Sequence, residues 1–107
     1  MALIAPQRAD ADGVALTYAS AGASDTFAPV RGGFLLYRTS GTSSNLSIVV
    51  PGNDEHGQAK TDVPVAMGAT AAVAIATGPY VDDAGSTGVV TITSSSQTGL
   101  TVAYVVP

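Results

Sequence analysis

The chain lacks cysteine, which excludes disulfide scaffolds, thiolate metal sites and cysteine nucleophiles. Basic residues are scarce: four Lys and Arg residues stand against eight Asp and Glu residues, for a net charge of −4. Four scattered cations cannot form the basic stripe that nucleic-acid binding requires. Charged residues of both signs make up only 11% of the 107 residues, against about 25% in an average domain. We therefore expect no nucleic-acid partner.

Long hydrophobic runs are absent as well. The longest nearly apolar stretch, Met67 to Ile75, contains Gly68 and Thr70 and is far shorter than the ~18 residues of a membrane helix. The first residues lack the basic segment of a signal peptide, and their apolar stretch ends at Pro6. We expect no membrane segment, and a protein that is made and kept in a cytoplasm.

Helix-forming residues are few, and β-like runs take their place. The chain has one glutamate and one lysine but 12 glycines and 6 prolines, proportions that disfavour helix. Short runs of β-forming or alternating residues lie between turn residues: Val14–Ala19, Phe34–Arg38, Leu46–Val50, Thr70–Thr77, Gly88–Thr93 and Leu100–Val106. In a further run over residues 62–66, Pro64 predicts a sheet edge or a bulge.

The spacing of these runs predicts an all-β fold with about seven or eight short strands. We expect a single antiparallel β-sandwich of jelly-roll or immunoglobulin-like type, or a flattened barrel. Residues 1–13 carry no periodic signal and are expected to form an extended N-terminal arm. Residues 14–107 are expected to form the sandwich domain.

Ionisable side chains gather in one loop, Asp54-Glu55-His56. Such a cluster binds a divalent metal or does acid–base chemistry when its groups converge. Three consecutive residues cannot all face one point, and the chain has no second histidine, so a solvated loop is the favoured interpretation. The stretch Asp82-Asp83-Ala84-Gly85 lacks the spaced ligands of a calcium loop and predicts a turn. We expect no catalytic residue, no metal and no cofactor, and a protein that is not an enzyme.

Phe34 and Tyr37 are the most informative of the aromatic residues. They lie on opposite faces of one predicted strand, because side chains alternate along a strand. Both cannot reach one core without a bulge, so one of them is expected to anchor a contact with another chain. The outward positions of many strands are Thr, Ser or Ala rather than charged residues. Two interpretations stay open: a soluble surface rich in Thr and Ser, or faces that partner subunits cover.

Four stretches carry a resemblance to a known family. They are Ala2 to Pro6 followed by Thr17-Tyr18; Asp25-Thr26-Phe27 with Gly33-Phe34-Leu35; Val63-Pro64-Val65 with Gly68-Ala69-Thr70 and Gly78-Pro79-Tyr80; and Asp82 to Thr93 with Thr101-Val102-Ala103. In these stretches, which span nearly the whole chain, the sequence resembles the small proteins encoded beside the major capsid gene of many tailed bacteriophages, especially those of actinobacteria. The loop Asp54-Glu55-His56 departs from that family.

The resemblance implies a capsid decoration (cement) protein, a virion structural protein that binds the outer surface of the bacteriophage head and stabilises the shell. The implied partner is the major capsid protein. The implied assembly is a homo-oligomer, with a trimer favoured because icosahedral lattices offer three-fold positions. Such a protein is assembled in the cytoplasm of the bacterial host and resides on the capsid surface.

The expected interface combines the arm with the aromatic strand. Its candidate residues are Leu3, Ile4, Pro6, Phe34 and Tyr37. We expect the arm to lie along a neighbouring subunit or the shell and to add strand-type hydrogen bonds there. Two other classes stay open: another phage structural protein, such as a head–tail joining protein, a tail protein or a head-fibre base, and a carbohydrate-binding β-sandwich module. A carbohydrate-binding module would need exposed aromatic residues for stacking, and six in total leave few to spare.

Overall fold

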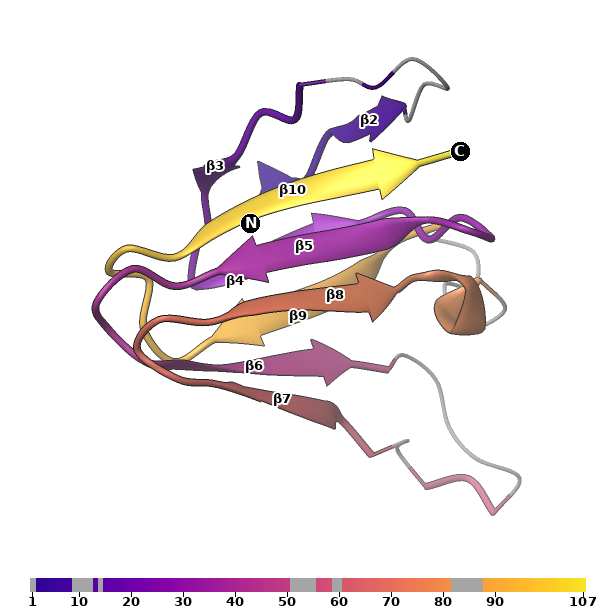
Figure 1. The fold of residues 1–107 in the computed structure, drawn as a ribbon. Coiled ribbons are helices and arrows are strands. Elements are labelled where there is room, and N and C mark those ends of the chain that lie inside the picture. The colour runs from indigo at the N-terminus through magenta and orange to yellow at the C-terminus, as the bar shows by residue number, and fades with distance from the viewer. Residues whose placement is uncertain (1, 9–12, 14, 51–55, 59–60, 82–87) are drawn as a thin grey trace.

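The structure is a computed structural model that describes residues 2–8, 13, 15–50, 56–58, 61–81 and 88–107. These residues form ten strand segments and one short 3₁₀ helix, η1 (Figure 1). The bounds are β1 (Ala2–Leu3), β2 (Pro6–Arg8), β3 (Ala19–Ser20), β4 (Ser24–Phe27), β5 (Phe34–Arg38), β6 (Ser44–Val49), β7 (Val63–Met67), β8 (Ala72–Ala76), η1 (Gly78–Tyr80), β9 (Val90–Ser94) and β10 (Thr101–Val106). The described ranges contain no α-helix, so the predicted all-β fold is confirmed.

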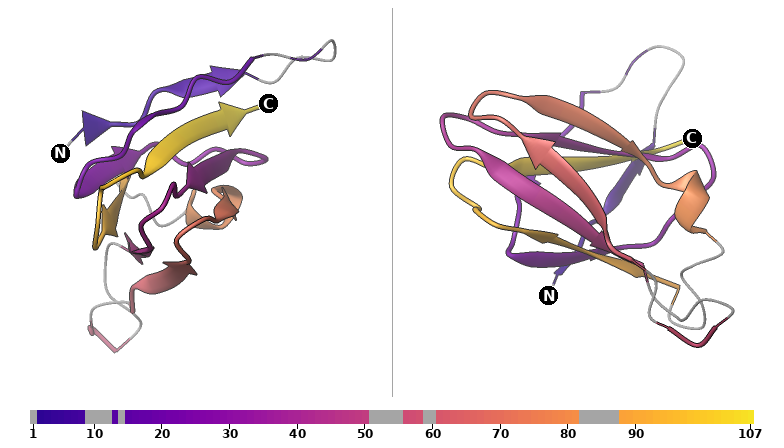
Figure 2. Two further views of the ribbon diagram at one scale, coloured as in Figure 1. Left: turned by 60° about the vertical axis from the view of Figure 1, so that its left-hand side comes forward. Right: turned by 90° about the horizontal axis from the view of Figure 1, so that it is seen from below.

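The strands form two mostly antiparallel sheets that pack face to face (Figures 1 and 2). Sheet A has the order β1-β4-β9-β6-β7, and sheet B has the order β2-β10-β5-β8, with β3 also paired to β10. Three antiparallel pairs are nested: β6 with β7, β5 with β8, and β4 with β9. Nested pairs of this kind are typical of jelly-roll sandwiches. The described strands do not close into a barrel, so the structure has the sandwich and not the flattened barrel.

The core lies between the sheets, where alternation sends every second side chain. In β5, Leu35 and Tyr37 are buried, whereas Phe34 and Arg38 are exposed. The ring of Phe27 packs edge-on against those of Tyr80 and Tyr104, with centroids 6.3 and 6.2 Å away. The buried apolar cluster comprises Ala21, Phe27, Leu35, Tyr37, Leu46, Ile48, Met67, Ile75, Val90, Ile92, Leu100, Val102 and Tyr104.

The N-terminal arm joins both sheets of its own chain. Strand β1 pairs in parallel with β4 of sheet A, and β2 pairs in parallel with β10 of sheet B. Between them, Ile4 donates its N–H to the carbonyl of Thr26 at 2.8 Å and packs its side chain against the core. Residues 2–8 therefore bridge one open side of the sandwich, and the strand bonds expected with a neighbouring chain are made within this chain.

The strand predicted over Val14–Ala19 is confirmed only at Ala19. Residue 14 lies outside the described residues, and residues 15–18 form no strand; only Ala19–Ser20 pair with β10. The reason is that the backbone of Thr17 forms its hydrogen bonds with the side chain of Gln7 instead of with a neighbouring strand. The Gln7 amide donates to the Thr17 carbonyl at 2.8 Å, and its oxygen accepts the Thr17 N–H at 2.9 Å.

The hydroxyl group of Thr77 forms hydrogen bonds with several segments at the η1 end of the sandwich. Thr77 is fully buried, donates from Oγ1 to the carbonyl of Val30 at 2.7 Å, and accepts the Val30 N–H at 3.3 Å. The Tyr104 hydroxyl lies 3.5 Å from the same oxygen and donates to the carbonyl of Ala28. Gly33 packs so closely here that an added Cβ would lie 2.7 Å from Thr77 Oγ1. The space at residue 33 therefore fits only glycine.

Candidate interaction surface

The outer face of sheet B carries mostly apolar side chains. Three rows of side chains cross β8, β5 and β10: Ala76, Phe34 and Val105; Ala74, Leu36 and Ala103; Ala72, Arg38 and Thr101. We call these nine residues the sheet B face, which Figure 1 shows from the front. Ala103 is buried, and the other eight are exposed or half-buried. Two of the three rows contain no polar side chain.

Phe34 is the bulkiest residue of the sheet B face. It is 45% exposed, although a fully solvated aromatic ring is uncommon in a small domain. Tyr37, on the same strand, is 2% exposed and belongs to the core. The expected division of these two residues between opposite faces is thus present, and it assigns the outward position to Phe34. Tyr37 has no surface with which to contact a partner.

Arg38 is the one charged residue among the nine. Its guanidinium carbon lies 3.8 Å from the centroid of the Tyr18 ring, which places the cation over the aromatic face. Beside it is a pocket of about 560 Å³, whose lining includes Thr39, Ser40, Ala71 and Ala72. The positive charge therefore lies in one end row of the sheet B face, and the other eight residues of that face are uncharged.

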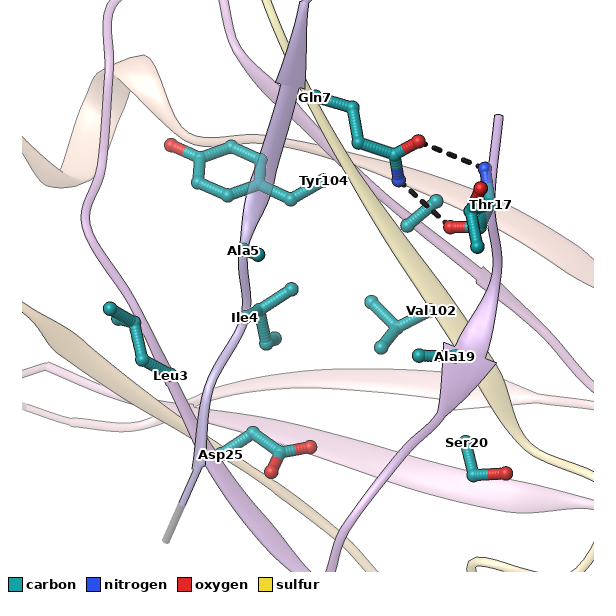
Figure 3. Close-up of a pocket in the computed structure, with 11 residues that line it drawn as sticks. Leu3, Ile4, Ala5, Gln7, Thr17, Ala19, Ser20, Asp25, Val102 and Tyr104 are labelled. Carbon is teal, nitrogen blue, oxygen red and sulfur yellow. Dashed lines mark hydrogen bonds between the residues drawn. The ribbon is translucent and has the colours of Figure 1, made fainter. Parts of the chain in front are cut away.

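A second pocket, of about 440 Å³, lies where the arm passes from sheet A to sheet B (Figure 3). Its lining comprises Leu3, Ile4, Ala5, Gln7, Thr17, Ala19, Ser20, Asp25, Val102, Ala103 and Tyr104. Leu3 is 61% exposed and Pro6 is exposed, whereas Ile4 is half-buried. Of the three arm residues predicted for the interface, Leu3 and Pro6 are thus accessible, and Ile4 is largely committed to this chain's core.

Asp25 brings the only acidic group to this pocket. It is buried, and its Oδ2 accepts the N–H of Gly22 at 2.8 Å, which fixes the turn before β4. Burial raises the pKa of Tyr37 above its ordinary value, and the negative charge of Asp25 raises it further. A single carboxylate held by a backbone turn, beside a tyrosine that stays neutral, has no partner among the pocket residues for acid–base catalysis.

The acidic clusters considered in the sequence fall mostly outside the described residues. Asp54, Glu55, Asp82 and Asp83 lie there, and His56 is exposed in a turn. Within the described ranges, no three His, Asp or Glu side chains gather in a group that could hold a metal ion. In the same part of the chain, no helix is long and apolar enough to cross a membrane.

Comparisons of the chain with protein-family models, with curated proteins and with solved structures found no significant match.

Sequence reasoning missed most of the sheet B face. Leu36 and Val105 were not singled out, and the alternation of Ala72, Ala74 and Ala76 with Val73 and Ile75 did not say which set points outward. A signal was present, because alanine at every second position beside large apolar residues indicates a face that tolerates close approach. Only the pairing of β8 with β5 shows that these alanines extend the surface around Phe34.

Proposed function

We propose that this chain is a structural protein of a bacteriophage virion, a capsid decoration protein that binds the outer surface of the head through the sheet B face and stabilises the shell. The observation that carries the proposal is the exposed, largely apolar sheet B face, which includes the exposed ring of Phe34. A second line of support is the resemblance of the sequence to capsid-associated phage proteins. The partner is the major capsid protein, and the assembled site is the surface of the virion.

The free energy gained by covering Phe34 is small for one copy, which suits a protein that attaches in many copies to a lattice. A phenylalanine buries on the order of 200 Å². The 45% of Phe34 that stays exposed therefore offers about 90 Å², or about 2 kcal/mol when covered. Contacts of this size are weak singly, but on a lattice they act together when copies are linked to one another. Binding that favours the mature shell over its opened form stabilises the shell by mass action.

The experiment measures co-sedimentation of the purified protein with heads of the phage that encodes it, prepared without this protein. Wild type is expected to bind and to raise the temperature at which heads release their DNA. Phe34→Ser is expected to weaken binding about 30-fold, from the loss of about 2 kcal/mol. Val49→Ser is the matched control, because Val49 is an exposed apolar residue on the outer face of sheet A.

The same preparation tests the assembly. Native mass spectrometry of the free protein and image reconstruction of decorated heads measure the number of copies at each site, for which we propose three. Failure of wild type to bind heads contradicts the decoration function. Equal losses in Phe34→Ser and Val49→Ser contradict the assignment of the sheet B face as the attachment surface.

A further inference from the structure

Strand β8 is an open edge of sheet B, and its hydrogen bonds show which of its backbone groups are unused. The Thr77 N–H donates to the Gly33 carbonyl at 3.0 Å, and the Thr39 N–H donates to the Ala71 carbonyl at 2.9 Å. Both bonds lie in the β5–β8 register. In an antiparallel pair, residues that bond the neighbour alternate with residues whose N–H and C=O point away. Odd-numbered residues of β8 therefore bond β5.

The even-numbered residues Ala72, Ala74 and Ala76 direct their N–H and C=O groups away from β5. All three are exposed, and no described strand pairs with this edge. The strand contains no charge, no proline and no glycine. Natural proteins usually protect an open edge with such residues or with a bulge, because an unprotected edge is a template for another strand.

The other open edge on this side of the sandwich is protected. The Ser95 N–H donates to the Asn45 carbonyl, so odd-numbered residues of β6 bond β9 and even-numbered ones bond β7. By the β6–β7 register, Pro64 then lies at a position that faces the free edge, where it has no N–H to offer. Of these two neighbouring edges, β8 alone presents a full set of donors and acceptors.

Sheet A extends beyond the open edge of β8. Its strands β6 and β7 lie below β8 in Figure 1 and nearest the viewer on the right of Figure 2. A second whole sandwich that approached edge-on would meet β7. On that overhang, Val63 is 36% exposed and Val65 is half-buried, although both share the inward face of β7 with the buried Met67. An added strand would cover these two valines.

This chain does not supply that strand from its described residues. Its one extended arm, residues 2–8, already pairs with β4 and β10. Because that arm is already paired, the donor that fits the proposed function is a projecting segment of the shell protein. Its chemistry follows from the site: an extended run of about five uncharged residues, with apolar side chains at the alternate positions that face Val63 and Val65.

We propose that the edge of β8 accepts an extended strand of the shell protein, which pairs with the backbone of Ala72, Ala74 and Ala76. The identity of the donor rests on the proposed decoration function. The pairing explains why this edge is unprotected while the neighbouring β7 edge carries proline.

The test is amide hydrogen exchange of the protein bound to heads, read residue by residue after quenching and release. Pairing is expected to slow exchange at Ala74 and Ala76 at least tenfold relative to the free protein. The amides of Val73 and Ile75, which already bond β5, are expected to change little. Alternating slowed and unchanged exchange along β8 distinguishes strand pairing from a partner that merely covers β8, because simple coverage would slow the exchange of all neighbouring amides.

Two variants test the same bonds. Ala74→Pro removes an outward N–H and is expected to weaken head binding at least tenfold, whereas Ala74→Ser keeps that N–H and is expected to bind like wild type. Ala66→Pro is the matched control, because it makes the same change at the free edge of β7. The exchange measurement on wild type decides the matter if Ala74→Pro does not fold.

Each outcome has a distinct meaning. Head binding without slowed exchange at Ala74 and Ala76 overturns the strand pairing and leaves the decoration function standing. Absence of head binding overturns both. Slowed exchange in concentrated free protein without heads identifies a second copy as the donor and overturns the assignment to the shell protein.

Discussion

Replacing Leu35 or Phe34 by alanine tests the assignment of β5 to two faces, on which the interaction surface depends. Leu35 has 0% of its surface exposed, whereas its neighbour Phe34 is 45% exposed. Leu35→Ala removes about three buried carbon groups, worth about 2.4 kcal/mol in transfer free energy. The cavity left behind raises the expected loss in free energy of unfolding to about 3–4 kcal/mol.

Phe34→Ala removes a larger side chain but is expected to cost less. Half of the ring is already in water, and the neighbours in its row, Ala76 and Val105, are small or half-buried. No enclosed cavity forms, so the expected loss is about 1–1.5 kcal/mol, mostly from reduced packing on the sheet surface. The larger deletion should thus have the smaller effect.

Urea denaturation followed by circular dichroism measures both losses. With a slope of about 1.5 kcal/mol/M, Leu35→Ala should lower the midpoint by about 2 M and Phe34→Ala by less than about 1 M, with unchanged slopes. A Phe34→Ala loss equal to or greater than that of Leu35→Ala would show that Phe34 is a core residue. The sheet B face would then not exist as described.

Three further outcomes are expected. Gly33→Ala should lower the free energy of unfolding by about 2 kcal/mol or more, because its Cβ would lie 2.7 Å from Thr77 Oγ1. Gly68→Ala is the control, because a Cβ at residue 68 would have nothing within 4 Å. Equal melting temperatures of the two variants would contradict the close packing at Gly33. The pKa of Tyr37 is raised in the folded protein, so above about pH 10 the unfolded chain releases its proton first and stability falls, by up to about 1.4 kcal/mol per pH unit. Tyr37→Phe should flatten this alkaline loss in urea titrations, and an unchanged slope would refute the cause. Deleting residues 1–8 should cost about 2 kcal/mol because β4 and β10 lose their parallel neighbours, and an unchanged urea midpoint would show that the arm adds no stability.

Several elements could be predicted because their signals are local. The large residues of β5 and β10 predicted strands there, and Leu100, Val102 and Tyr104 are buried in the structure. Pro64 predicted an edge strand, and β7 is the edge of sheet A. These predictions succeeded because side-chain alternation and the missing N–H of proline act within a few residues.

The interaction surface could be predicted only in part. Sequence placed Phe34 and Tyr37 on opposite faces but could not say which one is outward, because either parity satisfies the alternation. The strand expected at residues 15–18 failed because Gln7, ten residues from Thr17, bonds its backbone. The arm was expected to serve a neighbour, yet residues 2–8 pair within the chain, since only the folded sheets create the edges that receive them.

By itself, the sequence determined that this chain is a β protein without disulfides, with few charges and with small or apolar residues on its strand surfaces. Those properties follow from composition and from spacing along the chain. The tertiary structure alone decided that Phe34, Leu36 and three alanines share one face. It also decided that β8 has a free edge with all its N–H groups, whereas the free edge of β7 lacks the N–H at Pro64. Such features depend on which strands become neighbours, and contacts between distant segments leave no signature in a local pattern.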